Sequence, residues 1–230
     1  MMETHTQGTA LLHLLQLSDT AFPTGSFAHS MGLEAFAGAG RLRSAEDLER
    51  LAGVYLNSLS TSDCVALRAA YAARLDEVIV IDRLLSATKL ARELRSASIA
   101  TGGRFLASVA ALGVESTLLE DYTRAVRGEE SPGNMAVGYG VAALALELEV
   151  QEALLSYLFT ATSSLVAAGQ KLIPIGGSAA QRVLYRFNAE IIKVLEKSEE
   201  VALEDMYAFA PEVDARSMLH ERQRVRLFIS

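Results

Sequence analysis

The chain has 230 residues, half of them hydrophobic, and carries a formal net charge of −7. An acidic balance argues against a nucleic-acid partner, because phosphates require a basic surface. The single cysteine, Cys64, excludes an internal disulfide framework and a cysteine-based zinc site. The start, MMETHTQGTALLHLL, lacks the basic residues and long apolar run of a signal peptide, so we expect a protein of the reducing cytoplasm.

The first unusual segment is LSDTAFPTGSFAHSMGLE, residues 17–34, which combines Pro, Gly, His and several hydroxyls. Its composition is that of an active-site loop. Pro23 and Gly25 predict a turn, and Ser26 is expected to cap a helix that begins near Phe27. A catalytic reading would use Ser26 or Ser30 as nucleophile with His29, but the G-x-S-x-G pattern and an obvious orienting carboxylate are missing.

The next segments read as helices. SAEDLERLAGVYLNSL opens with a capping pattern at Ser44 and keeps its apolar residues on one face. The run VIVI, residues 78–81, is the one β-like stretch, and its charged flanks suit a helix equally well. After the break at residues 132–133, a helix is expected from about Asn134.

Within that helix, GYGVAA fits the loose dinucleotide pattern G-x-G-x-x-A, but no strand precedes it, so helix packing by small residues is favoured. Residues 153–170 are uncharged and reach the length of a membrane span, yet five of them are Ser or Thr. We therefore expect a buried central helix of a soluble protein, ended by Pro174. A further helix follows, with Ser178 as its expected N-cap. The pattern predicts one all-α domain of roughly ten helices over residues 1–230.

Motifs for chemistry are weak throughout. SATK and GQKL each match only a fragment of a catalytic or phosphate-binding motif, so the chain is not expected to hydrolyse GTP or ATP. The four histidines are scattered and do not form a pair at helical spacing. We expect no catalytic residue, no metal site and no cofactor. The histidines are His5, His13, His29 and His220.

The carboxyl-terminal segment, about residues 211–230, mixes arginines with apolar and aromatic residues, a composition enriched at interface hot spots. Chain ends are usually polar and frayed. We expect a partner-binding tail that is disordered or loosely docked in the free protein and becomes ordered on binding. The alternative is a last helix docked on its own domain.

Four segments resemble the urease accessory protein F (UreF) family, in the family's order and over nearly the whole chain. They are LLQLSDTAFPTGSFAHSMGLE, LARELRSASIATGGRFL, LVAAGQKLIPIGGSAAQRVL and SMLHERQRVRLFIS. The resemblance implies an all-helical homodimer that bridges a second accessory protein, called D or H, and the GTPase UreG. The assembled complex loads nickel into apo-urease. The small-residue stripes GYGVAALALE and SSLVAAG would let helices approach closely, so we expect them to support the homodimer. Asn134 departs from the family, which tends to carry a histidine there, and Phe36 stands where relatives may have Tyr or Trp.

By this resemblance, Glu34, Glu93 and Lys171 face the GTPase, although each could equally be a solvated charge or an intramolecular ion pair. The helix after the opening loop is expected to present Glu34 and Phe36 outward. The full set of expected partner-binding residues is Glu34, Phe36, Glu93, Lys171, Met218, His220, Arg222, Arg226 and Phe228.

Two other functional classes stay open beside this scaffold. One is a small helical hydrolase using Ser26, His29 and Glu34, and the other is an unrelated helical interaction module. Turnover of a substrate by the purified chain would favour the hydrolase. Co-elution with a GTPase would favour the scaffold, and urease activity that does not depend on the chain would favour the unrelated module.

Overall fold

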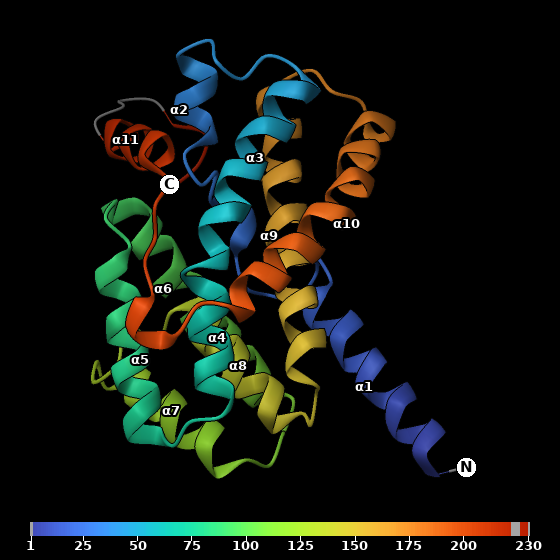
Figure 1. Cartoon of the computed structure of the whole chain (residues 1–230), viewed down its shortest axis with the longest axis vertical. Helices are drawn as coiled ribbons and strands as arrows, with labels where there is room; N and C mark the ends of the chain where they lie inside the picture. The colour runs from blue at the N-terminus through green and yellow to red at the C-terminus, as the bar shows by residue number, and fades with distance from the viewer. Residues whose placement is uncertain (1, 222–225, 230) are drawn as a thin grey trace.

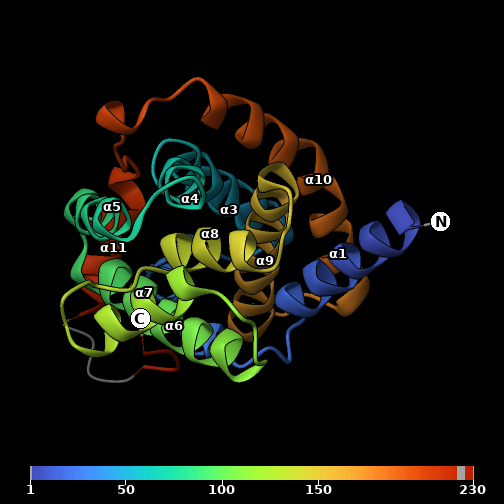
Figure 2. The same cartoon turned by 90° about the horizontal axis from the view of Figure 1, so that it is seen from below.

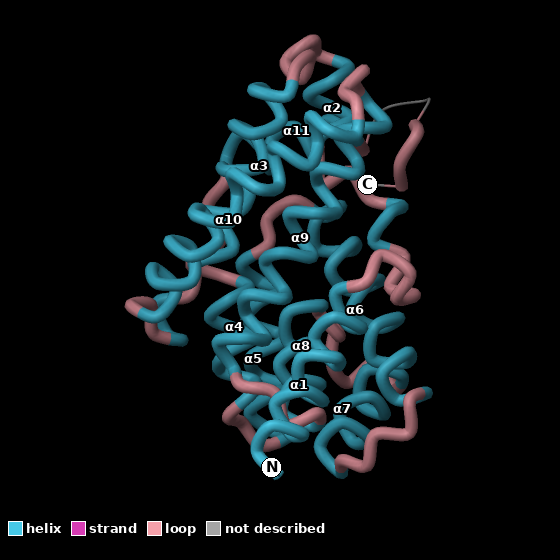
Figure 3. The backbone as a smooth tube through the Cα atoms, turned by 90° about the vertical axis from the view of Figure 1, so that its right-hand side faces the viewer, coloured by secondary structure: helices cyan, strands magenta, loops and turns pink. Residues whose placement is uncertain are grey.

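The computed structural model describes residues 2–221 and 226–229, and these residues form helices and loops without a strand (Figure 3). The all-α class is thereby confirmed. The ambiguous run at residues 78–81 is helical. The elements are α1 (Met2–Ser18), η1 (Ser26–Ala28), α2 (Leu33–Gly38), α3 (Ala45–Ser60), α4 (Asp63–Tyr71), α5 (Leu75–Thr88), α6 (Arg92–Ala111), α7 (Thr117–Arg127), α8 (Met135–Ala145), α9 (Val150–Leu172), α10 (Gly177–Glu199), η2 (Leu203–Asp205) and α11 (Pro211–His220).

Helix α8 lies in the middle of the molecule, between α4, α6 and α9 (Figure 2). All of its residues from 136 to 143 are buried. A methyl group at Gly138 would press on the side chain of Leu106, and one at Gly140 would overlap the carbonyl oxygen of Leu67. The small residues of GYGVAA therefore let neighbouring helices approach closely, which confirms the packing interpretation of this motif.

A buried carboxylate joins α5 to the start of α8. Asp82 is fully buried and accepts hydrogen bonds from the backbone N–H groups of Gly133 (2.6 Å) and Asn134 (2.9 Å). Its carboxylate also accepts the hydroxyls of Tyr122 (2.9 Å) and Ser131 (2.7 Å). Asn134 is itself fully buried, and its amide nitrogen lies 2.8 Å from Asp82 Oδ1. Asn134 is thus part of the chain's internal framework.

The helix ends agree only partly with the predicted caps. Ser44 caps α3, since its hydroxyl accepts the N–H of Asp47 at 3.2 Å. The cap predicted for Ser26 is wrong, because Ser26 is the first residue of η1 and Gly25, with φ of 71°, precedes it. The cap predicted for Ser178 is also wrong, since α10 begins at Gly177 and its N-cap is Gly176.

The uncharged stretch at residues 153–170 lies within α9 and buries one face, from Ala153 to Gly169. Pro174 follows the end of this helix, as expected. Within the part of the chain that the structure describes, the helices are too short or too polar to cross a membrane.

The two ends of the chain lie far apart (Figure 1). Helix α1 extends away from the other helices and packs on α9, whereas α11 packs on α2 and α6. The end near α11 gathers most of the residues that the sequence singled out.

Candidate functional site

Two glutamates meet at one histidine where α2, α6 and α11 come together. His220 Nδ1 lies 2.8 Å from Glu93 Oε2, and His220 Nε2 lies 2.9 Å from Glu34 Oε2. The imidazole is fully buried, and the two carboxylate side chains are 9% and 13% exposed. Each ring nitrogen thus has one carboxylate partner. We call Glu34, Glu93 and His220 the histidine cluster.

The last residues of the chain attach to the same glutamate. The backbone N–H groups of Leu227 and Phe228 donate to the Glu34 carboxylate at 2.6 and 3.0 Å, and Ile229 N–H donates to the carbonyl of Ala28 at 2.8 Å. Phe228 is 5% exposed. The described tail residues thus lie docked on their own domain, the alternative arrangement considered above, because a buried carboxylate supplies the backbone partners that a chain end usually lacks. That a partner orders the tail further stays a prediction.

These hydrogen bonds also determine the ionisation of Glu34. Burial alone would raise the pKa of its carboxyl group. The N–H of Leu227, the ring of His220 and the N–H of Phe228 all stabilise the charged form, and the net effect lowers the pKa. Glu34 is thus held as a carboxylate by the segment that it binds.

Arg226 fixes the tail from a second direction. Its Nη1 lies 3.0 Å from Glu93 Oε1, and its Nη2 donates to the carbonyl of Glu221. The Arg226 side chain is 30% exposed. Glu221 in turn pairs with Arg92 at 3.0 Å.

Lys171 connects the opening segment to the tail. Its ammonium lies 5.8 Å from the ring centre of Phe27 and 5.4 Å from that of Phe228. Both distances are within the range of cation–π attraction. Lys171 itself is exposed at the end of α9.

Phe36 does not face outward as expected. Its side chain is 1% exposed, and the guanidinium of Arg216 lies 5.7 Å from its ring centre. Helix α2 sits against α11 so closely that a methyl group at Gly32 would come within 2.8 Å of Ser217 Oγ. The apolar face of α2 therefore turns inward, and the outward presentation of Glu34 and Phe36 is corrected.

Around the docked tail, several apolar side chains remain exposed. Met218 is 45% and Leu219 53% exposed on α11, and Leu227 and Ile229 are each 65% exposed. We call these four residues the apolar rim.

Arg222, which was expected to bind a partner, lies outside the described residues. The expected residues thus divide into an inner group that holds the tail and an outer group available for contact.

The hydrolase arrangement lacks its carboxylate. Both oxygens of Glu34 are engaged by His220 and the tail backbone. Ser26 and His29 instead line a cavity on the other side of the opening segment. Burial, and next the charge of Arg104, lower the pKa of His29. Within the described residues, no group of three or more His, Cys, Asp or Glu side chains could hold a metal ion.

Sequence reasoning missed the charged pair of this cavity, Asp63 and Lys89, which are 26 residues apart and lie at 2.6 Å. A charged residue at a helix end resembles any solvated charge, so the sequence carries no signal for the pair.

Comparison with known proteins identifies the family. The UreF family model matches residues 42–188. The urease accessory protein UreF of Paenarthrobacter aurescens (strain TC1) is 36% identical over 223 residues, covering 96% of this chain and 99% of the relative. The UreF of Arthrobacter sp. (strain FB24) is 35% identical over 231 residues, covering 97% and 98%. That of Corynebacterium glutamicum (strain R) is 34% identical over 219 residues, covering 94% and 96%. The chain therefore belongs to the UreF family of urease accessory proteins.

Proposed function

We propose that this chain is a non-enzymatic scaffold that bridges the D/H accessory protein and the GTPase UreG during GTP-dependent nickel insertion into apo-urease in the cytoplasm. The observation that carries the proposal is the apolar rim around a docked chain end. Family membership supports the maturation role, and the geometry at α11 supports a binding surface there.

The rim has the features of an interaction surface. Its four side chains are roughly half exposed or more, and they lie on two adjoining segments, α11 and residues 226–229. Exposed apolar side chains on neighbouring segments, with charged residues on the same segments, are typical of protein–protein contact sites. We assign this rim to the D/H accessory partner.

The histidine cluster gives the rim its position. Glu34 and Glu93 are too buried to make a broad contact with a partner, so their role in GTPase recruitment is indirect. They hold the tail backbone, and the tail presents Leu227 and Ile229. Lys171 is exposed and the Arg226 side chain is 30% exposed, so both are charges of this region that a partner could contact.

We assign the binding and hydrolysis of GTP to the GTPase partner. The sequence lacks a complete phosphate-binding motif. The Glu34 carboxylate binds the tail backbone, so it does not orient His29 for catalysis. We therefore expect no GTP or magnesium affinity in the isolated chain. Micromolar GTP binding by the chain alone, measured by calorimetry, would contradict this assignment.

We further propose that the chain forms a homodimer through α1 rather than through its small-residue stripes. Gly138 and Gly140 pack against helices of the same chain, and Gly169 packs on Leu48. These small residues are therefore covered within one chain and are not exposed to a second copy. Helix α1 exposes three leucines along its length. They are Leu11 (57%), Leu12 (66%) and Leu15 (56%).

The experiment for the bridging role is a reconstituted urease activation with apo-urease, the D/H protein, the GTPase, nickel and GTP. Activation should require this chain, and it should fail when Leu219→Asp and Leu227→Asp are combined. The matched control is Val80→Asp, which places the same charge at a 53% exposed site on α5. Full activation without the chain would refute the proposal.

A further inference from the structure

A cavity with a mostly apolar lining and a few polar groups lies between α3, α6, α9 and α11, apart from the histidine cluster and the apolar rim. Its volume is about 90 Å³. Thr24, Ser26 and His29 of the opening segment form one of its walls. The segment whose composition is that of an active-site loop therefore lines a cavity.

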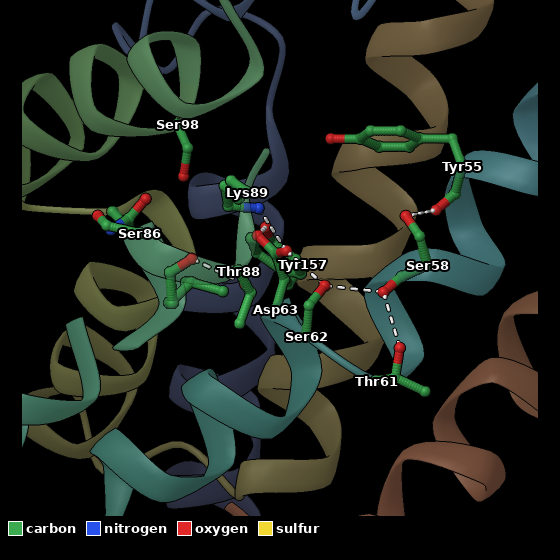
Figure 4. A network of polar contacts seen from close by, with 12 residues as sticks. Tyr55, Ser58, Thr61, Ser62, Asp63, Ser86, Thr88, Lys89, Ser98 and Tyr157 are labelled. Atoms are coloured by element: carbon green, nitrogen blue, oxygen red, sulfur yellow. Dashed lines mark hydrogen bonds and ion pairs between the residues drawn. The ribbon is translucent and has the colours of Figure 1, made fainter. Parts of the chain in front are cut away.

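A buried ion pair forms the floor of this cavity. Lys89 Nζ lies 2.6 Å from Asp63 Oδ2, and the two side chains are 10% and 3% exposed. The hydroxyl of Tyr157 donates to Asp63 Oδ1 at 2.8 Å (Figure 4). The Ser62 hydroxyl lies 3.0 Å from Asp63 Oδ2 and 2.7 Å from the carbonyl oxygen of Ser58, and its single proton serves one of these acceptors at a time. The carboxylate is thus well supplied with donors, and the pair as a whole carries no net charge.

Next to this ion pair, some donor groups of the cavity have no hydrogen-bond partner within the described residues. An ammonium has three donors, and within the described residues one of those on Lys89 is used, by Asp63. Ser98 Oγ is buried without a partner in the described part of the chain, and Ser98 is 8% exposed. Figure 4 shows the hydroxyls of Ser98 and Tyr55 and the ammonium of Lys89 pointing into the same space. Buried donors without acceptors are costly, so the space suits a guest that can accept from them.

The electrostatics of the cavity disfavour an ion. An anion would meet the Asp63 carboxylate, and a cation would meet the Lys89 ammonium. Burial lowers the pKa of His29, with a further contribution from Arg104, and burial raises the pKa of Asp214 in the wall formed by α11. Both groups are thus shifted toward their neutral forms. An uncharged guest fits best.

The volume limits the guest to a few heavy atoms. Pockets for cofactors and drug-sized ligands measure about 300–1,000 Å³. A cavity of about 90 Å³ is too small for a nucleotide or a sugar.

We propose that this cavity binds a small uncharged molecule of the amide or urea class. Its carbonyl oxygen accepts from Lys89 and Ser98, and its N–H groups donate to the wall hydroxyls, which can accept as well as donate. The site is independent of the scaffold role, because the isolated chain contains every group that forms it. A failure of one proposal therefore leaves the other standing.

The test is a titration of the isolated full chain with urea, followed by calorimetry and by ligand-observed NMR. Urea has four heavy atoms, so its dissociation constant cannot lie below about 0.04 mM, and we expect a value of roughly 1–10 mM. Titration to about 50 mM stays far below denaturing concentrations. Guanidinium and bicarbonate are the charged controls, since both are planar and close to urea in size. We expect saturable binding of urea and no binding of either ion in this range.

Two variants assign the binding to this cavity. Ser98→Ala removes one hydroxyl and should weaken urea binding about two- to ten-fold. Ser108→Ala, on the same helix, removes a hydroxyl that bonds to the carbonyl of Arg104, and it should change nothing. Melting curves of both variants verify the fold. Absence of saturation, equal binding by the Ser98 variant, or equal binding of guanidinium would each overturn the proposal and leave a cavity filled by water alone.

Discussion

His220 Nδ1 lies 2.8 Å from Glu93 Oε2, although 127 residues separate them in the chain. This contact ties α11 to the start of α6. Because Glu93 also pairs with Arg226 at 3.0 Å, one carboxylate joins the last helix, the chain end and the body of the protein. The position of the apolar rim follows from this arrangement.

Arg226→Ala should weaken the complex with the D/H protein by about 2 kcal/mol or more, as expected for an interface hot spot. Its pair with Glu93 is partly exposed, so the melting temperature of the free chain should change little. A pull-down paired with a melting curve measures both. Arg92→Ala is the control, because Arg92 is 72% exposed and pairs with Glu221. Normal binding by the Arg226 variant, or loss of binding caused by unfolding, would remove Arg226 from the interface.

Glu34→Gln should make the free energy of unfolding depend less on pH in the acidic range. The pKa of Glu34 is lowered in the folded chain, so its carboxylate stabilises the fold above the ordinary value of 4.5. That contribution is lost as the pH falls through the lowered pKa. The free energy of unfolding of the wild type should therefore exceed that of Glu34→Gln near neutral pH, and the two should converge in strong acid. Denaturant titrations across this range give the difference, and a gap that does not narrow in acid would contradict the assignment.

Gly102→Ala and Gly103→Ala should have opposite effects on stability. A methyl group at Gly102 would overlap the carbonyl oxygen of Gly133, which belongs to the loop fixed by Asp82. At Gly103, nothing lies within 4 Å of the added carbon. We expect a loss of about 1–3 kcal/mol for the first and a gain of about 0.5–1 kcal/mol for the second. The denaturant concentrations at the unfolding midpoints measure both changes. Equal effects of the two substitutions would show that α6 does not pack closely on this loop.

Asp82→Asn should destabilise the fold by about 3 kcal/mol or more, since several buried donors lose a charged acceptor at once. Asp76→Asn, on the same helix but 75% exposed at its side chain, is the control and should cost little. Chemical denaturation gives both values, provided that the slope of the free energy of unfolding against denaturant concentration is the same for each variant. A loss below about 1 kcal/mol at Asp82 would mean that the carboxylate is replaceable by an amide.

Leu12→Asp should shift the proposed homodimer toward monomer, because it places a charge among the exposed leucines of α1. Light scattering over a concentration series measures the shift. Val80→Asp, on α5, should leave the association unchanged. A wild-type chain that stays monomeric at high micromolar concentration, both alone and in the complex, would contradict dimer formation.

The sequence was informative where a local signal determines structure. Pro174 and the break at residues 132–133 bound the predicted helices, and Ser44 caps α3. The caps predicted for Ser26 and Ser178 failed because a glycine before each helix starts it without a side-chain acceptor. Local pattern alone does not distinguish these two kinds of helix start.

The site was predictable only as a set of residues. Resemblance to the family singled out Glu34 and Glu93, and His220 was among the expected partner-binding residues, yet nothing in the sequence revealed that they bind one another. Their contacts join residues 127 and 186 positions apart, and such contacts depend on how α2, α6 and α11 pack. Phe36 was misjudged for the same reason, since its burial depends on α11 lying over α2.

Size-exclusion chromatography with light scattering, applied to mixtures with the D/H protein, the GTPase and GTP, tests the central claim most directly. The compared chains are the wild type, the double variant Leu219→Asp with Leu227→Asp, and the control Val80→Asp, all with verified melting curves. We predict that the wild type and the control elute in one complex with both partners and that the double variant elutes without the D/H protein. Co-elution of the folded double variant with the D/H protein would contradict the assignment of the apolar rim as the partner-binding surface.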